Sequence, residues 1–93
     1  MEKARQLTQS RRETHGPFEI HANAKVALQA AFRINSRRGL KAVQRVGLDM
    51  IFEKISRIAV GDPDFIDHWE DISGYSQLVA DWLREEQNES ADV

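Results

Sequence analysis

Two basic and two acidic side chains flank a Gly-Asp-Pro turn in the middle of the sequence. Lys54 and Arg57 precede the turn, and Asp67 and Asp71 follow it. If the flanking segments are antiparallel helices, positions equidistant from the turn lie level with one another, so the basic residues would meet the acidic ones. Such a cluster either locks the hairpin through ion pairs or forms the wall of a small polar site.

These two alternatives assign different chemistry to the same side chains. In a site, Lys54 and Arg57 are phosphate-binding candidates, since guanidinium and ammonium groups both bind phosphate. Asp67, Glu70 and Asp71 are then metal-ligand candidates, and Mg²⁺ is the cofactor that such carboxylates suit. In the structural alternative, Lys54 and Arg57 form ion pairs with Asp67 and Asp71. We favour the ion pairs, because Asp71 lies beside the apolar arc of its helix, where a carboxylate needs a partner.

The elements that position these residues are predicted to be helices, because apolar residues recur at helical spacing throughout the chain. The expected helices cover residues 1–13, 18–35, 41–60 and 65–86. The sequence therefore predicts an all-α fold: an antiparallel four-helix bundle with one short N-terminal helix and three longer ones. We expect a single helical domain over residues 1–86 and a flexible acidic tail over residues 87–93. A chain of 93 residues has a small core, so we expect dimerisation to complete the bundle.

The aromatic residues of the last predicted helix are expected to lie in the core. Trp69, Tyr75 and Trp82 recur at helical spacing, which favours an aromatic core over a base-stacking surface. Gly74 lies in the middle of the same helix, where glycine costs about 1 kcal/mol relative to alanine, so we expect another helix to approach closely there. His68 is expected to be a packed, hydrogen-bonded histidine.

Composition and charge exclude several classes of protein. The chain contains no cysteine, which excludes disulfides, thiolate metal sites and thiol nucleophiles. Residues 1–60 carry twelve Lys/Arg and five Asp/Glu, whereas residues 61–93 carry one and ten. We expect these halves to neutralise one another within the chain or across a dimer. Nucleic-acid binding is less favoured, because the basic residues form no dense run and no aromatic platform is interleaved with them.

Two motifs resemble a known family. The segment Lys54-Ile55-Ser56-Arg57, the turn, and the segment from Asp67 to Tyr75 (DHWEDISGY) resemble an uncharacterised family of small phage and prophage proteins, over about residues 11–83. That family pairs a K-[IVL]-[AS]-R helix end with a D-x-W-x-D-[IL]-[AS]-G-Y helix. It is distantly similar to the all-α nucleoside-triphosphate pyrophosphatases of the MazG type and to nucleotide-modification-associated domains. The resemblance implies a helical, dimeric protein related to nucleotide enzymes.

The chain departs from the MazG-type pattern where the metal would bind. Those enzymes hold Mg²⁺ with E-x-x-E and E-x-x-D motifs on two helices. Here Glu53 is followed by Ser56 in place of the second acid, and the next helix offers only Asp67, Glu70 and Asp71. We therefore favour a phage-type accessory protein, without enzymatic activity, that binds a host or phage protein. The alternative is a nucleotide-binding or pyrophosphatase-like protein.

The expected location is the cytoplasm, in a bacterial host if a phage encodes the chain. The first twelve residues contain no apolar run of the kind found in signal peptides. No apolar stretch approaches the ~20 residues that a membrane span requires, so we expect no contact with a membrane.

Overall fold

The computed structural model of this chain describes residues 15–35 and 38–91. These residues form three α-helices: α2 (Phe18–Asn35), α3 (Ala42–Val60) and α4 (Ile66–Ala91). The described residues contain no β-strand, and the prediction of an all-α fold is confirmed. The short helix expected over residues 1–13 lies outside the described residues. None of the described helices is long and apolar enough to cross a membrane.

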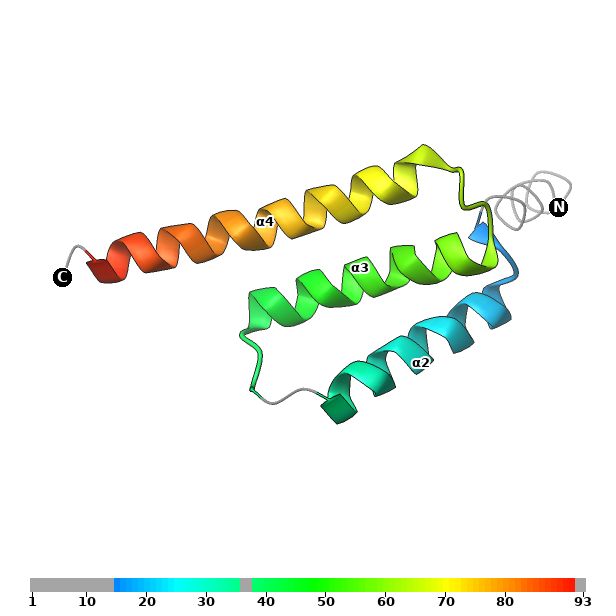
Figure 1. Cartoon of the computed structure of the whole chain (residues 1–93), viewed down its shortest axis with the longest axis horizontal. Helices are drawn as coiled ribbons and strands as arrows, with labels where there is room; N and C mark the ends of the chain where they lie inside the picture. The colour runs from blue at the N-terminus through cyan, green and yellow to red at the C-terminus, as the bar shows by residue number, and fades with distance from the viewer. Residues whose placement is uncertain (1–14, 36–37, 92–93) are drawn as a thin grey trace, which may run out of the picture.

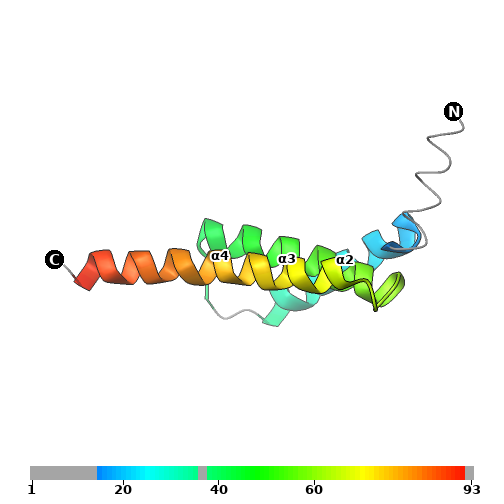
Figure 2. The same ribbon diagram turned by 90° about the horizontal axis from the view of Figure 1, so that it is seen from above.

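The three helices lie side by side in a single layer with α3 in the middle. Successive helices run in opposite directions, and both α2 and α4 pack against α3 (Figure 1). Within the described residues α2 and α4 do not contact each other. When the layer is viewed along its plane, the three helices overlap (Figure 2). The arrangement leaves both broad faces of α3 without a covering helix from the described residues.

Short polar contacts and glycines define the helix ends. At the start of α3, the Lys41 N–H donates to the side-chain oxygen of Gln44 at 2.9 Å, which satisfies one of the free donors of a helix N-terminus. At its end, the Gly61 N–H donates to the Arg57 carbonyl oxygen at 2.8 Å. In the turn that follows, the Asp62 carboxylate accepts from the Asp64 N–H at 2.9 Å. The last two contacts support the turn between α3 and α4.

The helix α4 is longer than the sequence indicates. The sequence predicts its end at Glu86 and a flexible tail over residues 87–93, whereas the helix continues to Ala91. No glycine or proline follows Gly74, and Gln87, Glu89 and Ala91 are residue types with good helix propensity, so nothing in this segment interrupts the helix. Residues 92–93 lie outside the described residues.

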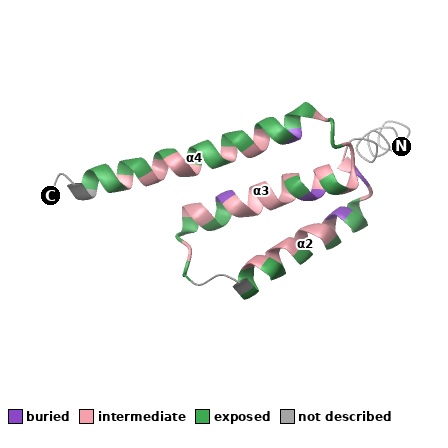
Figure 3. Cartoon of the chain, viewed as in Figure 1, coloured by how far each residue is buried: buried purple, intermediate pink, exposed green. Residues whose placement is uncertain are grey.

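Burial in this layer is the reverse of the usual pattern. No hydrophobic residue among the described ones is buried, and the buried side chains are His21, Ser56 and His68 (Figure 3). The expected aromatic core is therefore not found in the described residues. Trp69 is 55% exposed, its indole N–H donating to the Pro63 carbonyl at 2.8 Å. Tyr75 and Trp82 are half-buried. The large hydrophobic residues that are exposed are Phe18, Ile20, Val26, Ile34, Val46, Ile55, Ile66, Trp69 and Leu78.

The close approach of α3 and α4 occurs at Gly47. A Cβ atom at Gly47 would lie 2.5 Å from Cγ2 of Val79, so a side chain there would push the helices apart. The expectation of a close approach at Gly74 was wrong: Gly74 is exposed, and apart from its neighbours in α4 no atom of the described structure lies within 4 Å of a Cβ built there. A mid-helix glycine therefore does not by itself identify a helix contact.

Candidate functional site

Lys54 and Asp71 form an ion pair between α3 and α4. Lys54 Nζ lies 3.0 Å from Asp71 Oδ2, which is the pairing that the hairpin register indicates. The Lys54 side chain is 17% exposed and the Asp71 side chain is 45% exposed. The carboxylate is thus less buried than its place beside the apolar arc suggests. Contact with water reduces the desolvation cost of the pair and weakens its attraction.

Arg57 does not pair with Asp67. Its guanidinium lies 3.6 Å from the carboxylate of Glu53, one turn earlier on α3. Asp67 and Glu70 are exposed, and within residues 15–35 and 38–91 neither forms an ion pair. The Nε atom of Arg57 is buried and has no hydrogen-bond partner among the described residues. Of the predicted four-residue cluster, only the Lys54–Asp71 pair forms between the helices; Arg57 pairs instead with Glu53 within α3, and Asp67 takes part in neither pair.

The metal-ligand candidates do not converge. In the described part of the chain, no three residues of the types His, Cys, Asp and Glu are placed to hold a metal ion. Asp67, Glu70 and Asp71 all lie on α4, and Asp71 is engaged with Lys54. One carboxylate of the three is thus already charge-compensated by a lysine.

A buried polar cluster that the sequence did not reveal lies where α2 begins, α3 ends and α4 begins. Ser56 Oγ lies 2.6 Å from His21 Nδ1 and 2.7 Å from the Glu53 carbonyl oxygen. Because the hydroxyl has one hydrogen, both contacts are satisfied when Ser56 donates to Glu53 and His21 donates to Ser56. With its Nδ1 proton committed in this way, His21 does not act as a base toward Ser56, and the fully buried Ser56 is inaccessible to a substrate.

A contact between two further histidines lies at the same end of the layer. His15 Nδ1 lies 3.0 Å from His68 Nε2, so one ring donates a proton and the other accepts it. The Phe65 ring packs edge-on against both, with centroids 6.0 Å from His15 and 4.7 Å from His68. We name His15, His21, Ser56 and His68 the histidine cluster. The sequence predicted that His68 is packed and hydrogen-bonded. It did not predict the partners of these histidines, because those depend on how two turns fold.

Burial and nearby charges perturb the protonation of His21. Burial lowers the pKa of His21 below its ordinary value of 6.5, and the positive charge of Arg57 lowers it further. Lys25 and His68 act in the same direction, whereas Glu53 opposes them. His21 is thus held neutral at neutral pH, which suits its hydrogen bond to Ser56.

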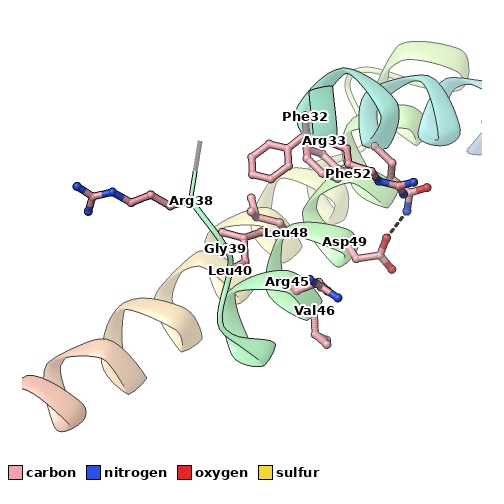
Figure 4. Close-up of a pocket in the computed structure, with 11 residues that line it drawn as sticks. Phe32, Arg33, Arg38, Gly39, Leu40, Arg45, Val46, Leu48, Asp49 and Phe52 are labelled. Carbon is pink, nitrogen blue, oxygen red and sulfur yellow. Dashed lines mark hydrogen bonds between the residues drawn. The ribbon is translucent and has the colours of Figure 1, made fainter. Parts of the chain in front are cut away.

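Two open grooves lie at the other end of the layer. The α2–α3 groove, of about 780 Å³, contains aromatic, aliphatic and charged side chains (Figure 4), among them Phe32, Phe52, Leu48, Arg33, Arg45 and Asp49. Asp49 accepts a hydrogen bond from Gln29 and lies 3.6 Å from Lys25 Nζ. The α3–α4 groove, of about 450 Å³, is lined almost wholly by apolar groups, including Val43, Val46, Met50, Tyr75, Leu78 and Val79. Val46 lines both grooves, so the two adjoin.

The chain matches no protein-family model, and searches of curated proteins and of solved structures found no match.

Proposed function

We propose that this chain is a small, non-catalytic accessory protein of the phage type, which acts as a homodimer and binds another protein. One observation carries the proposal: among the described residues every large hydrophobic side chain retains access to solvent, and nine are exposed. A folded domain gains most of its stability from apolar burial, so a layer without a buried apolar core needs a covering partner. Dimerisation would complete the helical bundle. We further propose that the protein works in the cytoplasm of a bacterial host.

The ion pairs support a structural role for the central charges. Lys54 is bound to Asp71 across the hairpin, and Arg57 is bound to Glu53 within α3. A phosphate or Mg²⁺ ion would have to compete with these intramolecular partners. The α3–α4 groove is lined almost wholly by apolar side chains, which fit a protein surface better than a triphosphate.

Nucleotide binding is the second candidate function. The observation that favours it is the buried Arg57 Nε atom, which has no hydrogen-bond partner among the described residues. Buried polar groups usually have such a partner, and a phosphate oxygen could supply one. In that case Lys54 and Arg57 would contact phosphate, while Asp67 and Asp71 would hold Mg²⁺.

Thermal melting separates the two candidates. The purified protein is melted alone and with millimolar Mg²⁺ together with nucleoside mono- or triphosphates. Because a ligand that binds only the native state raises the melting temperature, an accessory protein should show no shift. A concentration-dependent rise that disappears in Arg57→Gln would contradict the proposal and establish nucleotide binding.

Partner binding is tested by photo-crosslinking in bacterial cells. A photoreactive amino acid replaces Ile34, which is 82% exposed on α2, and the matched control replaces the exposed polar residue Asn88 on α4. We expect Ile34 to yield an adduct with a second protein, distinct in mass from the self-adduct, and Asn88 to yield much less. If neither position captures anything except another copy of the chain, the protein is a self-assembling one and the proposed partner is refuted.

A further inference from the structure

The α2–α3 groove combines an apolar floor with a cationic rim. Phe32 of α2 and Phe52 of α3 pack edge to face, with ring centroids 5.7 Å apart and an interplanar angle of 61°. These rings and Leu48 are half-buried, whereas Arg33 of α2 and Arg45 of α3 are exposed (Figure 4). An apolar floor with a few charged groups around it is the usual composition of a recognition surface.

The positive charge of this rim is not neutralised by the described part of the chain. Neither Arg33 nor Arg45 forms an ion pair with another described residue. Asp49 is the acidic residue that lines the groove, and it lies 3.6 Å from Lys25 Nζ and accepts a hydrogen bond from Gln29. Because the charge of Asp49 is already compensated, the two arginines are left to attract an anionic ligand.

The sequence around the groove adds no opposing charge. Residues 20–48 contain six Lys/Arg and no Asp/Glu. Two of the six are not counted with the rim: Lys41 lies 2.7 Å from the carboxylate of Glu86 on α4, and Arg38 points away from the groove (Figure 4). Most of α2 and the first part of α3 therefore leave the charge of Arg33 and Arg45 unopposed.

These features fit an acidic amphipathic helix. Between Arg45 and Phe52 the groove follows α3 for seven residues, which is ~10 Å at ~1.5 Å per residue, or about two turns of helix. A helix that lies in a groove of this kind places apolar side chains one turn apart on the floor, and its flanking carboxylates reach the rim.

A single-stranded nucleic acid fits the groove less well. Base stacking needs open ring faces, whereas Phe32 and Phe52 pack against each other. The helix α4 of the same small layer also carries seven carboxylates and one arginine, and these would repel a long polyanion.

We propose that the α2–α3 groove binds an acidic amphipathic helix of another protein, with the apolar side chains of that helix on Phe32, Leu48 and Phe52 and its carboxylates on Arg33 and Arg45. This inference rests on the protein-binding part of the proposed function, and it adds the contact surface and the chemistry of the partner.

Fluorescence anisotropy with labelled peptides tests the chemistry. The probes are a set of synthetic helical peptides of about 15 residues, since shorter helices are marginal in water. Each has leucine and phenylalanine along one face and glutamate along both flanks. Matched probes replace every glutamate with lysine or every apolar residue with serine, and a single-stranded oligothymidine represents nucleic acid. We expect binding of the acidic amphipathic peptides alone, with an affinity that falls as the salt concentration rises.

Arginine variants test the surface. Arg33→Gln and Arg45→Gln remove the charges of the rim, and Arg84→Gln is the matched control because Arg84 is exposed on α4 and does not line the groove. Such surface substitutions have little effect on stability, so each variant should fold, as circular dichroism will show. We expect the peptide dissociation constant to rise about threefold in each groove variant and about tenfold in the double variant, with no change in the control.

Three outcomes would overturn this inference. The acidic peptides fail to bind, the lysine peptides bind equally well, or the double variant binds as tightly as the wild type. Tighter binding of the oligothymidine through the same two arginines would assign the groove to nucleic acid instead.

The proposed function fails on a separate measurement. If the acidic peptides do not bind but crosslinking at Ile34 still captures a second protein, the groove is refuted as the contact surface and the proposed function stands. If Ile34 captures no second protein, the proposed partner is refuted whatever the peptides show.

Discussion

The two ends of α3 are packed in contrasting ways. Near its C-terminus, Ser56 is fully buried beside the two buried histidines, His21 and His68, and the backbone of Gly16 fits against Val60. Near its N-terminus, Val46 and Leu78 stand exposed at the edges of open grooves. We name the first region the closed end and the second the open face. Polar groups are enclosed only at the closed end, whereas exposed apolar groups occur at both: Phe18, Ile66 and Trp69 flank the closed end, as Val46 and Leu78 do the open face.

This contrast assigns different roles to the two regions. At the closed end, side chains from three chain segments satisfy one another's hydrogen bonds, so the specificity of the layer resides there. At the open face, apolar side chains retain water contact and their burial energy remains available to a partner. The closed end therefore fixes how the helices are arranged, and the open face is the surface that the proposed function assigns to a partner.

The largest effect is expected from Gly16→Ala at the closed end. Gly16 has a φ of 80°, and a Cβ there would lie 2.5 Å from Cγ1 and 2.8 Å from the carbonyl carbon of Val60. Left-handed strain and overpacking together should lower the free energy of unfolding by about 3 kcal/mol. Gly39→Ala is the control, because no atom of the described structure lies within 4 Å of its Cβ position. Equal urea midpoints for the two variants would contradict the tight packing at Gly16.

A smaller loss is expected from Ser56→Ala. The change removes the acceptor of the His21 Nδ1 proton and leaves a buried donor unpaired, which should cost about 2 kcal/mol. Urea unfolding measures the loss. The control is Ser76→Ala: its hydroxyl donates to the Ser73 carbonyl at 2.9 Å on the exposed side of α4, and its removal should change stability by a few tenths of that amount. A Ser56→Ala variant as stable as wild type would show that the hydrogen bond to His21 is not maintained in solution.

Acidification should also weaken the closed end. Burial and Arg57 hold the pKa of His21 below 6.5 in the folded protein, so the unfolded chain takes up a proton more readily. Stability is therefore complete above pH 6.5 and is lost as the pH falls through 6.5 toward the lower folded pKa.

The measurement is a series of urea titrations from about pH 8 to about pH 5, with His21→Gln as the control that lacks this titrating group. The control should show a shallower dependence on pH than the wild type. If wild-type stability does not fall over this range, His21 is not held neutral by the fold and the account of the closed end is wrong.

The smallest effect is expected between the two regions, at the ion pair of Lys54 and Asp71. Since the Asp71 side chain is 45% exposed, Asp71→Asn should lower the free energy of unfolding by less than about 1 kcal/mol. Thermal and urea unfolding both measure this change, and Asp81→Asn on the same helix is the control. A loss of about 3 kcal/mol or more would instead show that the carboxylate is buried and fully dependent on Lys54.

The helices could be predicted from the sequence, but their packing could not. The expected helix over residues 18–35 matches α2. The expected helix over 41–60 matches α3 at both ends to within a residue, and the one over 65–86 matches the start of α4 to within a residue but not its end. Strong apolar periodicity and the Gly-Asp-Pro turn explain this agreement. Apolar periodicity does not say whether another helix of the chain covers the apolar positions. Trp69 was therefore expected in a core although it is exposed.

Only the part of the candidate site that depends on local geometry could be predicted from the sequence. The register of one hairpin is enough to bring Lys54 level with Asp71. By contrast, His15, His21, Ser56 and His68 come from three chain segments, and their meeting requires two turns and the positive φ of Gly16 to be known together. Arg57 pairs with Glu53 because a partner one turn away on the same helix is nearer than one across the hairpin.

The most direct test of the contrast between the closed end and the open face is the melting temperature of the wild-type protein as a function of its own concentration. In the proposed homodimer a second copy covers the open face, so folding and association would be coupled, and mass action should raise the melting temperature steadily as concentration increases. Leu78→Glu should melt lower and show a weaker dependence on concentration. A wild-type melting temperature that is high and independent of concentration over a hundredfold range would show that the layer is stable alone, and would contradict this account.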